Sequence, residues 1–235
     1  MPCGHRRHAA SLRVVTVSIV LASASPARKR LLRAAGIEPS IVVSAVDEEA
    51  VTVRARETYG ELAAEDVALL LARAKAEDVA GQVAHAVVVG CDSVLELDGE
   101  VHGKPASAEE ALARWQQMSG SSGVLHTGHW VVDTREDDDG GTGATLGATA
   151  STTVHFARLD DAEIEAYVAT GEPLRVAGAF TLDGLGGPFV TGIEGDPSNV
   201  VGLSLPLLRE LLLELGLAWH DLRSSAHRGA QGERG

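Results

Sequence analysis

The feature that most constrains this chain is an uncharged, largely apolar stretch that runs directly into a serine–proline pair. Val14 to Ala22 is rich in Val, Ile and Leu, as expected of a buried β-strand. Ser25 suits the N-cap of a helix and Pro26 its first position, so we predict a basic helix from Ala27 to Ala35, ended by Gly36. The first N–H groups of a helix lack partners within it, so this strand and helix together predict an anion site.

The same stretch also fits an export signal. A basic start that includes Arg6, Arg7 and Arg13 precedes the apolar run, and Ala22-Ser23-Ala24 fits a small-residue cleavage site. On this window alone, a buried strand and a removable leader both remain open.

Strand-like and helix-like segments alternate along the rest of the chain, which predicts an α/β fold. The expected strands are Ser40 to Val46, Ala86 to Gly90, Val124 to Thr134 and Ala150 to Arg158, and the expected helices are Glu61 to Ala80, Ser107 to Met118, Asp160 to Thr170 and Leu205 to Leu215. A hairpin that turns at Asp98-Gly99 argues against a purely parallel sheet. We expect one domain over residues 14–222, with 1–13 and 223–235 as disordered tails and Glu136 to Gly147 as an acidic, Gly-rich loop.

Composition excludes several classes of protein. The formal net charge of −13 argues against stable nucleic-acid binding, which needs a basic face, and the aromatic content of 3% argues against stacking on bases. No apolar run is long enough for a membrane span. Cys3 and Cys91 have no disulfide-framework or metal-ligand spacing, which favours a reducing, cytoplasmic location.

The segment from Val87 to Pro105 carries the most chemistry. Asp92 follows a buried strand, where α/β proteins place their ligands, and could bind a divalent cation or take a proton from water. Lys104 follows the hairpin, which could return a cation to the neighbourhood of Asp92. Taken singly, each has an ordinary alternative: Asp92 as a turn former, Lys104 as a loop residue, and both Lys75 and Glu48 as solvated surface charges.

Three other candidates are weaker. His126 and His129 are three residues apart on an expected strand, so their side chains point to opposite faces and a shared metal is not expected. Cys91 suits a small core residue better than a nucleophile. The acidic run from Asp137 to Asp139 suits a solvated loop.

Taken together, an ordered set of motifs from about Val17 to Leu215 resembles the Maf family of nucleoside triphosphate pyrophosphatases. The family's first strand, serine–proline loop and Leu-Leu helix are matched, as is its acidic pair after the second strand. The matching segments are Ser23-Ala24-Ser25-Pro26-Ala27-Arg28 with Leu31-Leu32, Asp47-Glu48, Leu71 to Ala76, Gly90-Cys91-Asp92-Ser93, Gly103-Lys104-Pro105, Ser119-Gly120, Thr127-Gly128, Ala177 to Phe180, Gly184, and Gly195 to Leu203. On this resemblance the first strand belongs to the phosphate loop, so we interpret the export-like features as coincidence.

The resemblance implies a Maf/inosine-triphosphatase-like fold, a mixed, elongated β-sheet flanked by helices. It implies hydrolysis of ordinary or modified nucleoside triphosphates between the α and β phosphates, with Mg²⁺ or Mn²⁺ as cofactor and a homodimer as the usual assembly. By resemblance, Glu48 and Asp92 hold the metal, Asp92 also activates water, and the substrate is bound by Ser23, Ser25, Arg28, Lys75, Lys104 and Asp183.

The chain departs from the family pattern in several places. Ala27 replaces the first Arg of the usual pair, and Ser121 and Gly123 replace an Arg and a His. Asp183 replaces the Gln at the position that distinguishes nucleobases in the family, so the preferred base stays open. A nucleotide-binding regulator of septum formation, with weak or no hydrolysis, is the alternative function, and an exported acidic binding protein is a third hypothesis.

Overall fold

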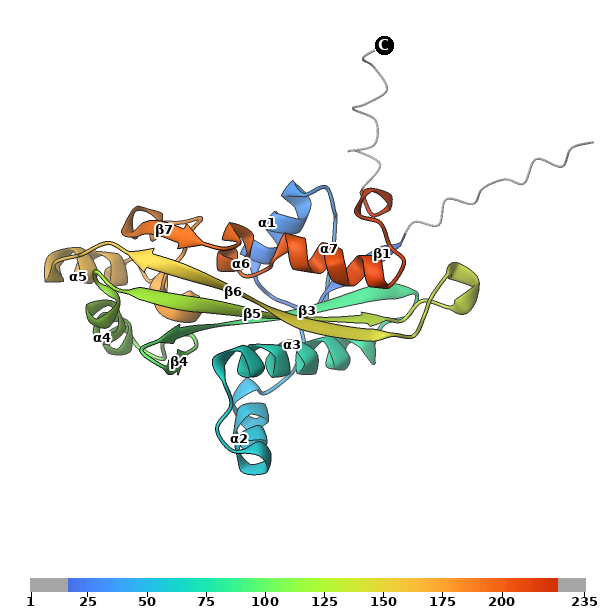
Figure 1. Cartoon of the computed structure of the whole chain (residues 1–235), viewed down its shortest axis with the longest axis horizontal. Helices are drawn as coiled ribbons and strands as arrows, with labels where there is room; N and C mark the ends of the chain where they lie inside the picture. The colour runs from blue at the N-terminus through green and yellow to red at the C-terminus, as the bar shows by residue number, and fades with distance from the viewer. Residues whose placement is uncertain (1–16, 224–235) are drawn as a thin grey trace, which may run out of the picture.

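One mixed sheet runs through the part of the chain that the structure describes. The structure is a computed structural model that describes residues 17–223, so the expected disordered tails lie outside it, apart from Arg223. Its seven strands follow the order β2-β1-β3-β5-β6-β7, with β4 beside β3 (Figure 1). The strands are β1 (Ser18–Leu21), β2 (Ser40–Ile41), β3 (Ala86–Leu97), β4 (Glu100–His102), β5 (Ser122–Asp133), β6 (Thr145–Phe156) and β7 (Val190–Glu194). The predicted α/β class and mixed sheet are therefore confirmed.

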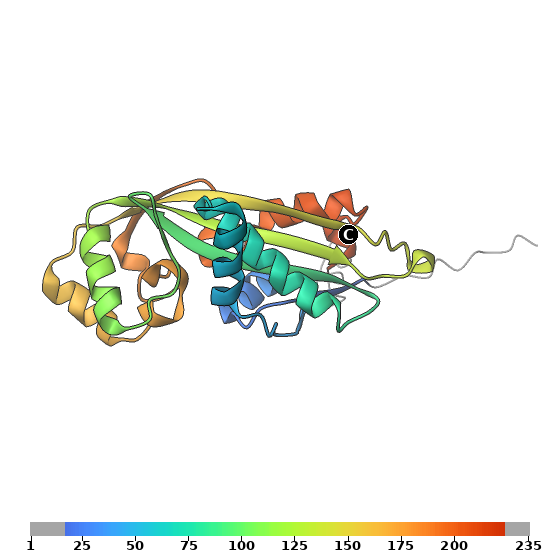
Figure 2. The same cartoon turned by 90° about the horizontal axis from the view of Figure 1, so that it is seen from below.

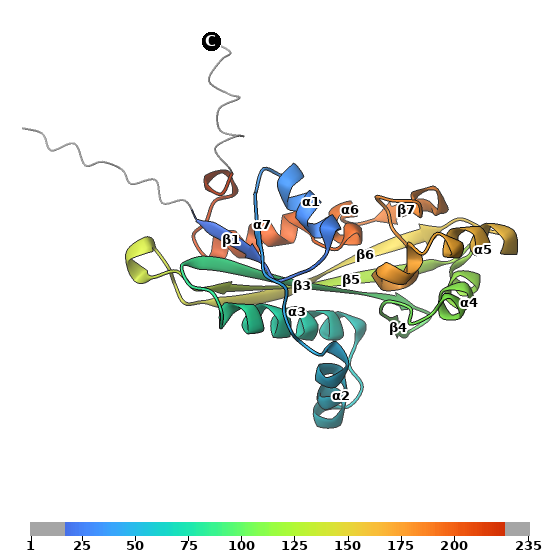
Figure 3. The same ribbon diagram turned by 180° about the vertical axis from the view of Figure 1, so that it is seen from behind.

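Seven α-helices cover the two faces and one end of this sheet within residues 17–223. They are α1 (Pro26–Ala34), α2 (Glu48–Tyr59), α3 (Ala64–Ala80), α4 (Ala108–Met118), α5 (Asp161–Ala169), α6 (Pro197–Val201) and α7 (Leu205–Glu214). Helix α3 lies along one face, with α2 crossing beside it (Figure 2). Helices α1, α6 and α7 lie on the opposite face, and α4 and α5 lie at one end (Figures 1 and 3). None of these helices is both long and apolar enough to cross a membrane.

Strand β3 is continuous from Ala86 to Leu97. The prediction that it ends at Gly90 is wrong, because β5 pairs with it in antiparallel register from Val87 to Glu96 and carries it past the polar residues. Asp92 therefore lies in the middle of a strand, opposite Gly128. The predicted hairpin at Asp98-Gly99 is confirmed, with β4 as its returning strand.

The opposite edge of β3 is interrupted. Strand β1 pairs with this edge in parallel as far as Val89, and β4 pairs with it only from Leu95 onward. Within the described chain, no strand lies beside Gly90 to Val94 on this edge, a segment that we call the β3 gap. Both neighbouring strands end at the gap: Leu21 ends β1 opposite Val89, and His102 at the end of β4 lies opposite Leu95. The loops that follow β1 and β4 therefore start on either side of it.

Helix α3 packs against the sheet at two glycines. A Cβ atom added at Gly90 would lie 2.3 Å from the Ala72 carbonyl oxygen, and one at Gly128 would lie 2.3 Å from that of Ala68. Such contacts are closer than atoms can approach, so only glycine permits this packing. The absence of side chains here brings the backbone of α3, and Lys75 upon it, close to β3.

The hydrophobic core is divided along the long strands. On the α7 side, Leu32, Leu203 and Leu208 pack with Cys91 in one cluster, whereas at the α4–α5 end Trp115 packs against Phe156 and other aromatic rings. Strands β3, β5 and β6 pass through both clusters. The β3 gap lies along β3 between the α7-side cluster and the α4–α5 cluster.

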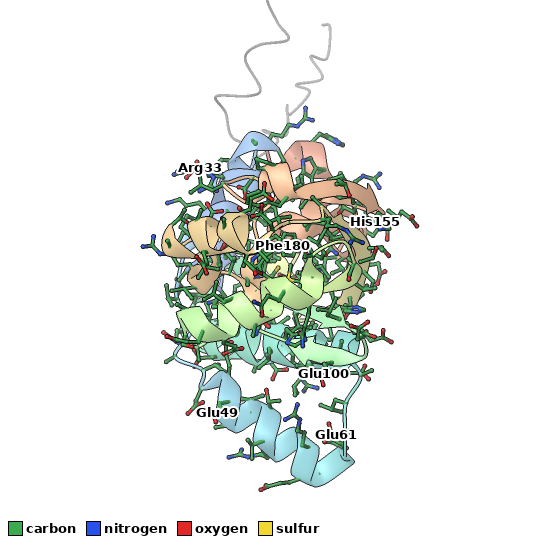
Figure 4. All side chains as sticks on the ribbon, turned by 90° about the vertical axis from the view of Figure 1, so that its left-hand side faces the viewer. Arg33, Glu49, Glu61, Glu100, His155 and Phe180 are labelled. Carbon is green, nitrogen blue, oxygen red and sulfur yellow. The ribbon has the colours of Figure 1, made fainter. Side chains whose placement is uncertain are left out.

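Most expected helices are confirmed, with bounds shifted by a few residues at their ends. Ser25 caps α1 and Asp160 caps α5, as predicted. Helix α2 was not predicted, and it projects away from the sheet with Glu49 near one end and Glu61 just past the other (Figure 4). Strand β7 and helix α6 were not predicted either, and β6 begins inside the expected acidic loop.

Candidate active site

Two carboxylates share one lysine at the β3 gap. Lys75 Nζ lies 2.5 Å from Asp92 Oδ1 and 2.7 Å from Glu48 Oε1. Lys75 and Asp92 are buried, and Glu48 is partly exposed. The three residues come from α3, β3 and the first turn of α2, so the fold brings together charges that the sequence alone could place on the surface.

The position of Glu48 follows from the start of α2. Asp47 is the N-cap of this helix, and its carboxylate accepts a hydrogen bond from the Ala50 N–H at 3.0 Å. Glu48 then occupies the first helical position, where a negative charge is favoured by the helix dipole. The two acidic residues that follow the second strand therefore have different roles: Asp47 caps the helix and Glu48 forms an ion pair with Lys75.

The pKa values of the two carboxylates move in opposite directions. Burial raises the pKa of Asp92, although the charges of Lys75 and Arg28 oppose this change. Burial acts in the same direction on Glu48, but the bond from Lys75 and the charges of Lys75, Lys104 and Arg28 outweigh it and lower the pKa of Glu48. The pKa of Asp92 therefore lies above its ordinary value and that of Glu48 below it, and Lys104 and Arg28 lie within electrostatic reach of Glu48.

The loop between β1 and α1 is organised by its two serines. Ser25 Oγ accepts a hydrogen bond from the Arg28 N–H at 3.4 Å, which caps α1, and Ser23 Oγ accepts one from the Ser25 N–H at 3.2 Å. The loop leaves β1 at the β3 gap, where the Ala22 N–H still donates to the Val89 carbonyl. The first turn of α1 therefore begins beside the gap, in the arrangement predicted for an anion site.

Arg28 is more enclosed than the sequence suggests. Its guanidinium donates to Gly202 O at 2.6 Å, Cys91 O at 2.8 Å, Ser23 Oγ at 3.0 Å and Ser93 Oγ at 3.1 Å. A guanidinium has five N–H donors, so one remains for a ligand. Arg28 thus joins the serine loop, the gap edge of β3 and the segment after α6, and it offers a phosphate little more than a long-range positive charge.

Lys104 and Asp183 lie at the margins of this cluster. Lys104 is exposed on the loop that follows β4, on the side of the gap opposite the serine loop. Asp183 forms an ion pair with Arg30 of α1 at 2.7 Å, which ties its loop to the helix of the serine loop. The structure therefore brings together Ser23, Ser25, Arg28, Glu48, Lys75 and Asp92, with Lys104 within electrostatic reach of Glu48 and Asp183 outside their hydrogen-bond network.

Two buried or partly buried groups that support these loops had no signal in the sequence. Arg114 of α4 donates to the carbonyl of Gly103, next to Lys104. Glu172 accepts hydrogen bonds from Tyr167 and Thr181 and from the N–H groups of Leu185 and Gly186, which holds the loop that carries Asp183. Charged residues on a helix or in a turn are usually solvated, so only the three-dimensional contacts identify them.

The alternative candidates do not form sites. His126 contacts Ser151 and Glu96, whereas His129 contacts Thr127 O and the Ser204 N–H, so the two rings have separate surroundings. Burial raises the pKa of the Cys91 thiol to about 11, which makes it a poor nucleophile, as expected of a core residue.

The carboxylate pair suits a hard divalent cation. Lys75 contacts one oxygen of each carboxylate, so each retains a second oxygen for another ligand. Within the described residues, no group of three or more acidic, His or Cys side chains could hold a metal, so Glu48 and Asp92 would supply only two protein ligands. Magnesium is commonly bound by one or two carboxylates, waters and substrate phosphates, and the residues present fit that pattern.

Comparison with known proteins places this chain in a family. A family model described as Maf-like protein matches residues 18–215. A protein from Salinispora tropica named nucleoside triphosphate pyrophosphatase is 56% identical over 204 residues, covering 85% of this chain and 84% of that protein. Proteins of the same name from Streptomyces coelicolor and Thermosynechococcus vestitus are 56% and 53% identical, and the matches cover 88% of this chain in both cases and 95% and 98% of those proteins.

Proposed function

This chain belongs to the family of Maf-like proteins, and on that premise we propose that it is a nucleoside triphosphate pyrophosphatase. The enzyme hydrolyses the anhydride between the α and β phosphates, giving a nucleoside monophosphate and pyrophosphate. The observation that carries the proposal is the Glu48–Lys75–Asp92 cluster at the β3 gap, which faces both the serine loop and the Lys104 loop.

The β3 gap offers the two features that phosphoryl transfer requires. These are positive charges and N–H donors for the triphosphate, and a carboxylate that can take a proton from the attacking water. Lys75, Lys104, the hydroxyl groups of Ser23 and Ser25, and the first N–H groups of α1 would neutralise phosphate oxygens. Arg28 would act mainly by fixing the loop, because most of its donors are already occupied.

Asp92 would take a proton from the attacking water. Its carboxylate is buried and its pKa is raised, which favours a base over a mere counter-ion. The proton passes to the Asp92 carboxylate and the water oxygen bonds to the α phosphorus. The bond between that phosphorus and the bridging oxygen breaks, and pyrophosphate leaves with the bridging oxygen. Lys75 keeps the carboxylate in place through this step.

A divalent cation, Mg²⁺ or Mn²⁺, is part of the proposal. Glu48 and Asp92 would hold it, and when bound it would neutralise charge on the phosphate oxygens. We also propose a cytoplasmic location, where nucleoside triphosphates are made and used, and a homodimer, both on the family resemblance.

Analysis of the products in ¹⁸O-labelled water tests the proposed bond cleavage. The protein with Mg²⁺ and a panel of ordinary and modified nucleoside triphosphates should release pyrophosphate, and ³¹P spectra should show which phosphorus carries the label. Release of a nucleoside diphosphate and orthophosphate would contradict the proposal. Nucleotide binding without turnover by the folded protein would favour a nucleotide-binding regulator of septum formation.

A further inference from the structure

The loop that carries Lys104 is short and held at both ends. It follows β4, with Gly103 and Lys104 exposed and Pro105 buried. A lysine on a free loop would have to be ordered each time it met a ligand, at a cost in conformational entropy. The fixed ring of Pro105 removes part of that freedom. The remainder depends on how the backbone on either side of Lys104 is held.

Two residues of α4 hold that backbone. Arg114 Nη1 donates to the Gly103 carbonyl at 2.6 Å, just before Lys104, and Glu110 Oε2 accepts a hydrogen bond from the Ala106 N–H at 2.8 Å, just after it. Glu110 Oε1 and Arg114 Nη2 are themselves paired, one helical turn apart. The Arg114–Glu110 ion pair, which we call the clamp, therefore contacts both ends of the Lys104 loop.

A third contact links this clamp to the opposite side of the loop. The Gly178 N–H also donates to the Gly103 carbonyl, at 3.2 Å. Gly178 has a φ of +70°, and a Cβ there would lie 2.9 Å from Leu95 Cβ, so the position is built for glycine. The Gly103 carbonyl thus accepts two hydrogen bonds, one from Arg114 of α4 and one from the Gly178 N–H.

The clamp is an unusual way to stabilise a fold. The Arg114 side chain is only 4% exposed, but that of Glu110 is 45% exposed, and an ion pair with an exposed partner contributes little to stability. Its hydrogen bonds specify one backbone conformation instead. Helix α4 also places this anchor at the α4–α5 end of the molecule, whereas Lys75 lies on α3, which packs against the sheet at Gly90 and Gly128.

We propose that Arg114 and Glu110 are positioning residues that act through Lys104. They fix the loop so that the Lys104 ammonium faces the phosphate-binding cluster before a substrate arrives. This inference rests on the proposed function, in which Lys104 contacts substrate phosphates. It predicts that removal of the clamp weakens binding of nucleoside triphosphate and pyrophosphate more than it lowers kcat.

A double-mutant cycle tests the inference. First, kcat at saturating nucleotide is measured for wild type and Arg114→Met, and it should change less than kcat/KM. Then kcat/KM and the affinity for inorganic pyrophosphate in titration calorimetry are compared for Arg114→Met, Lys104→Met and the double variant. In the otherwise native chain, Arg114→Met should lower both by about 10-fold, below the roughly 100-fold loss that a misplacement of 1 Å can cause. In the Lys104→Met background, Arg114→Met should lower kcat/KM and pyrophosphate affinity less than about twofold, because the lysine that the clamp positions is absent.

Controls separate this role from general destabilisation. Arg33→Met removes an exposed ion pair between Arg33 of α1 and Glu38, and should leave both quantities unchanged. If Arg114→Met does not fold, Arg114→Lys can keep one of the two contacts, and Glu110→Gln can still accept from Ala106 while it loses the ion pair. Each is expected to show the same dependence on Lys104, with a smaller loss.

Equal losses in both backgrounds would overturn the clamp and leave Arg114 a structural residue. No loss from Lys104→Met alone would overturn it together with the role of Lys104. Failure of the proposed function is a separate result: if the protein releases no pyrophosphate but binds it with Lys104-dependent affinity, the calorimetric cycle still decides on the clamp.

Discussion

Lys75 and Asp92 form the shortest link between the helix that covers the sheet and the strand that crosses its middle. The Lys75 ammonium lies 2.5 Å from Asp92 Oδ1 and also 2.7 Å from Glu48 Oε1. One positive charge therefore lies between two negative ones at the site where a divalent cation is proposed to bind. A metal ion must therefore compete with this lysine for the two carboxylates.

Removal of Lys75 should strengthen metal binding while it abolishes turnover. In the absence of nucleotide, Lys75→Gln should bind Mn²⁺ about 10-fold more tightly, because roughly 1.4 kcal/mol of competing electrostatic attraction is lost. Titration followed by electron paramagnetic resonance measures free Mn²⁺ directly. Lys29→Gln, which makes the same change in net charge on α1, is the matched control. Weaker Mn²⁺ binding by Lys75→Gln would show that the lysine does not compete with the metal.

Replacement of Arg28 should destabilise the fold. Arg28→Met leaves the carbonyls of Cys91 and Gly202 without their donor, and we expect the free energy of unfolding to fall by about 2–4 kcal/mol. Urea denaturation measures the change. Arg30→Met, on the same helix but in an exposed ion pair, should cost no more than about 1 kcal/mol. Similar small losses for both variants would mean that Arg28 is mainly a ligand-binding residue.

Insertion of one methyl group at Gly90 should separate Lys75 from Asp92. The new Cβ would meet Ala72 O at 2.3 Å and Ala76 Cβ at 2.8 Å, so α3 must shift away from β3. We expect Gly90→Ala to cost about 1–3 kcal/mol in stability and at least about 10-fold in kcat/KM. Gly81→Ala is the control, because a Cβ at the end of α3 finds its nearest atom at 3.6 Å. Unchanged activity in Gly90→Ala would contradict the dependence of the site on this packing.

Acid should destabilise the protein through His129. Burial lowers its pKa to about 4, and the bond to Thr127 O only partly opposes this, so the folded protein keeps the ring neutral. The unfolded chain takes up a proton near pH 6.5. The free energy of unfolding should therefore fall by up to about 3 kcal/mol as the pH decreases from 7 to 4. His129 Nδ1 donates to Thr127 O while Nε2 accepts from the Ser204 N–H, which fits the neutral ring.

The His129→Gln variant isolates this contribution. Burial also lowers the pKa of His102, which adds to the same pH dependence in both proteins. The difference in unfolding free energy between wild type and variant, measured by urea denaturation at several pH values, should thus shrink steadily below pH 6.5. A difference that is independent of pH would exclude a role for His129 in the acid sensitivity.

Local signals in the sequence were reliable where the structure depends on neighbours in the chain. The Ser25 and Asp160 caps act within three residues, and the hairpin turn at Asp98 acts within two. The length of β3 was missed because it depends on pairing with β5, and its own sequence contains Gly90 and Asp92, which usually end strands. Helix α2 was missed because its residues are mostly exposed and lack a clear apolar stripe.

The candidate site also depends on contacts between residues that are distant in the sequence. Motifs select the candidate residues, but they do not identify the partners that those residues contact. Arg28 looked like a phosphate ligand because its acceptor Gly202 lies 174 residues away in the chain. Arg114 looked like an ordinary helix residue, since nothing in its neighbourhood in the sequence marks the carbonyl of Gly103 as its target.

The most direct test of the central claim is pyrophosphate release by wild type and Asp92→Asn under saturating nucleoside triphosphate and Mg²⁺. Asparagine keeps the shape of the side chain but cannot take the proton from water, so we predict that kcat falls at least about 1,000-fold. Calorimetry should show that the nucleotide still binds, and thermal unfolding that the variant is folded. A folded Asp92→Asn variant that retains more than a tenth of the wild-type kcat would contradict the account, because the reaction would then not depend on the carboxylate at the β3 gap.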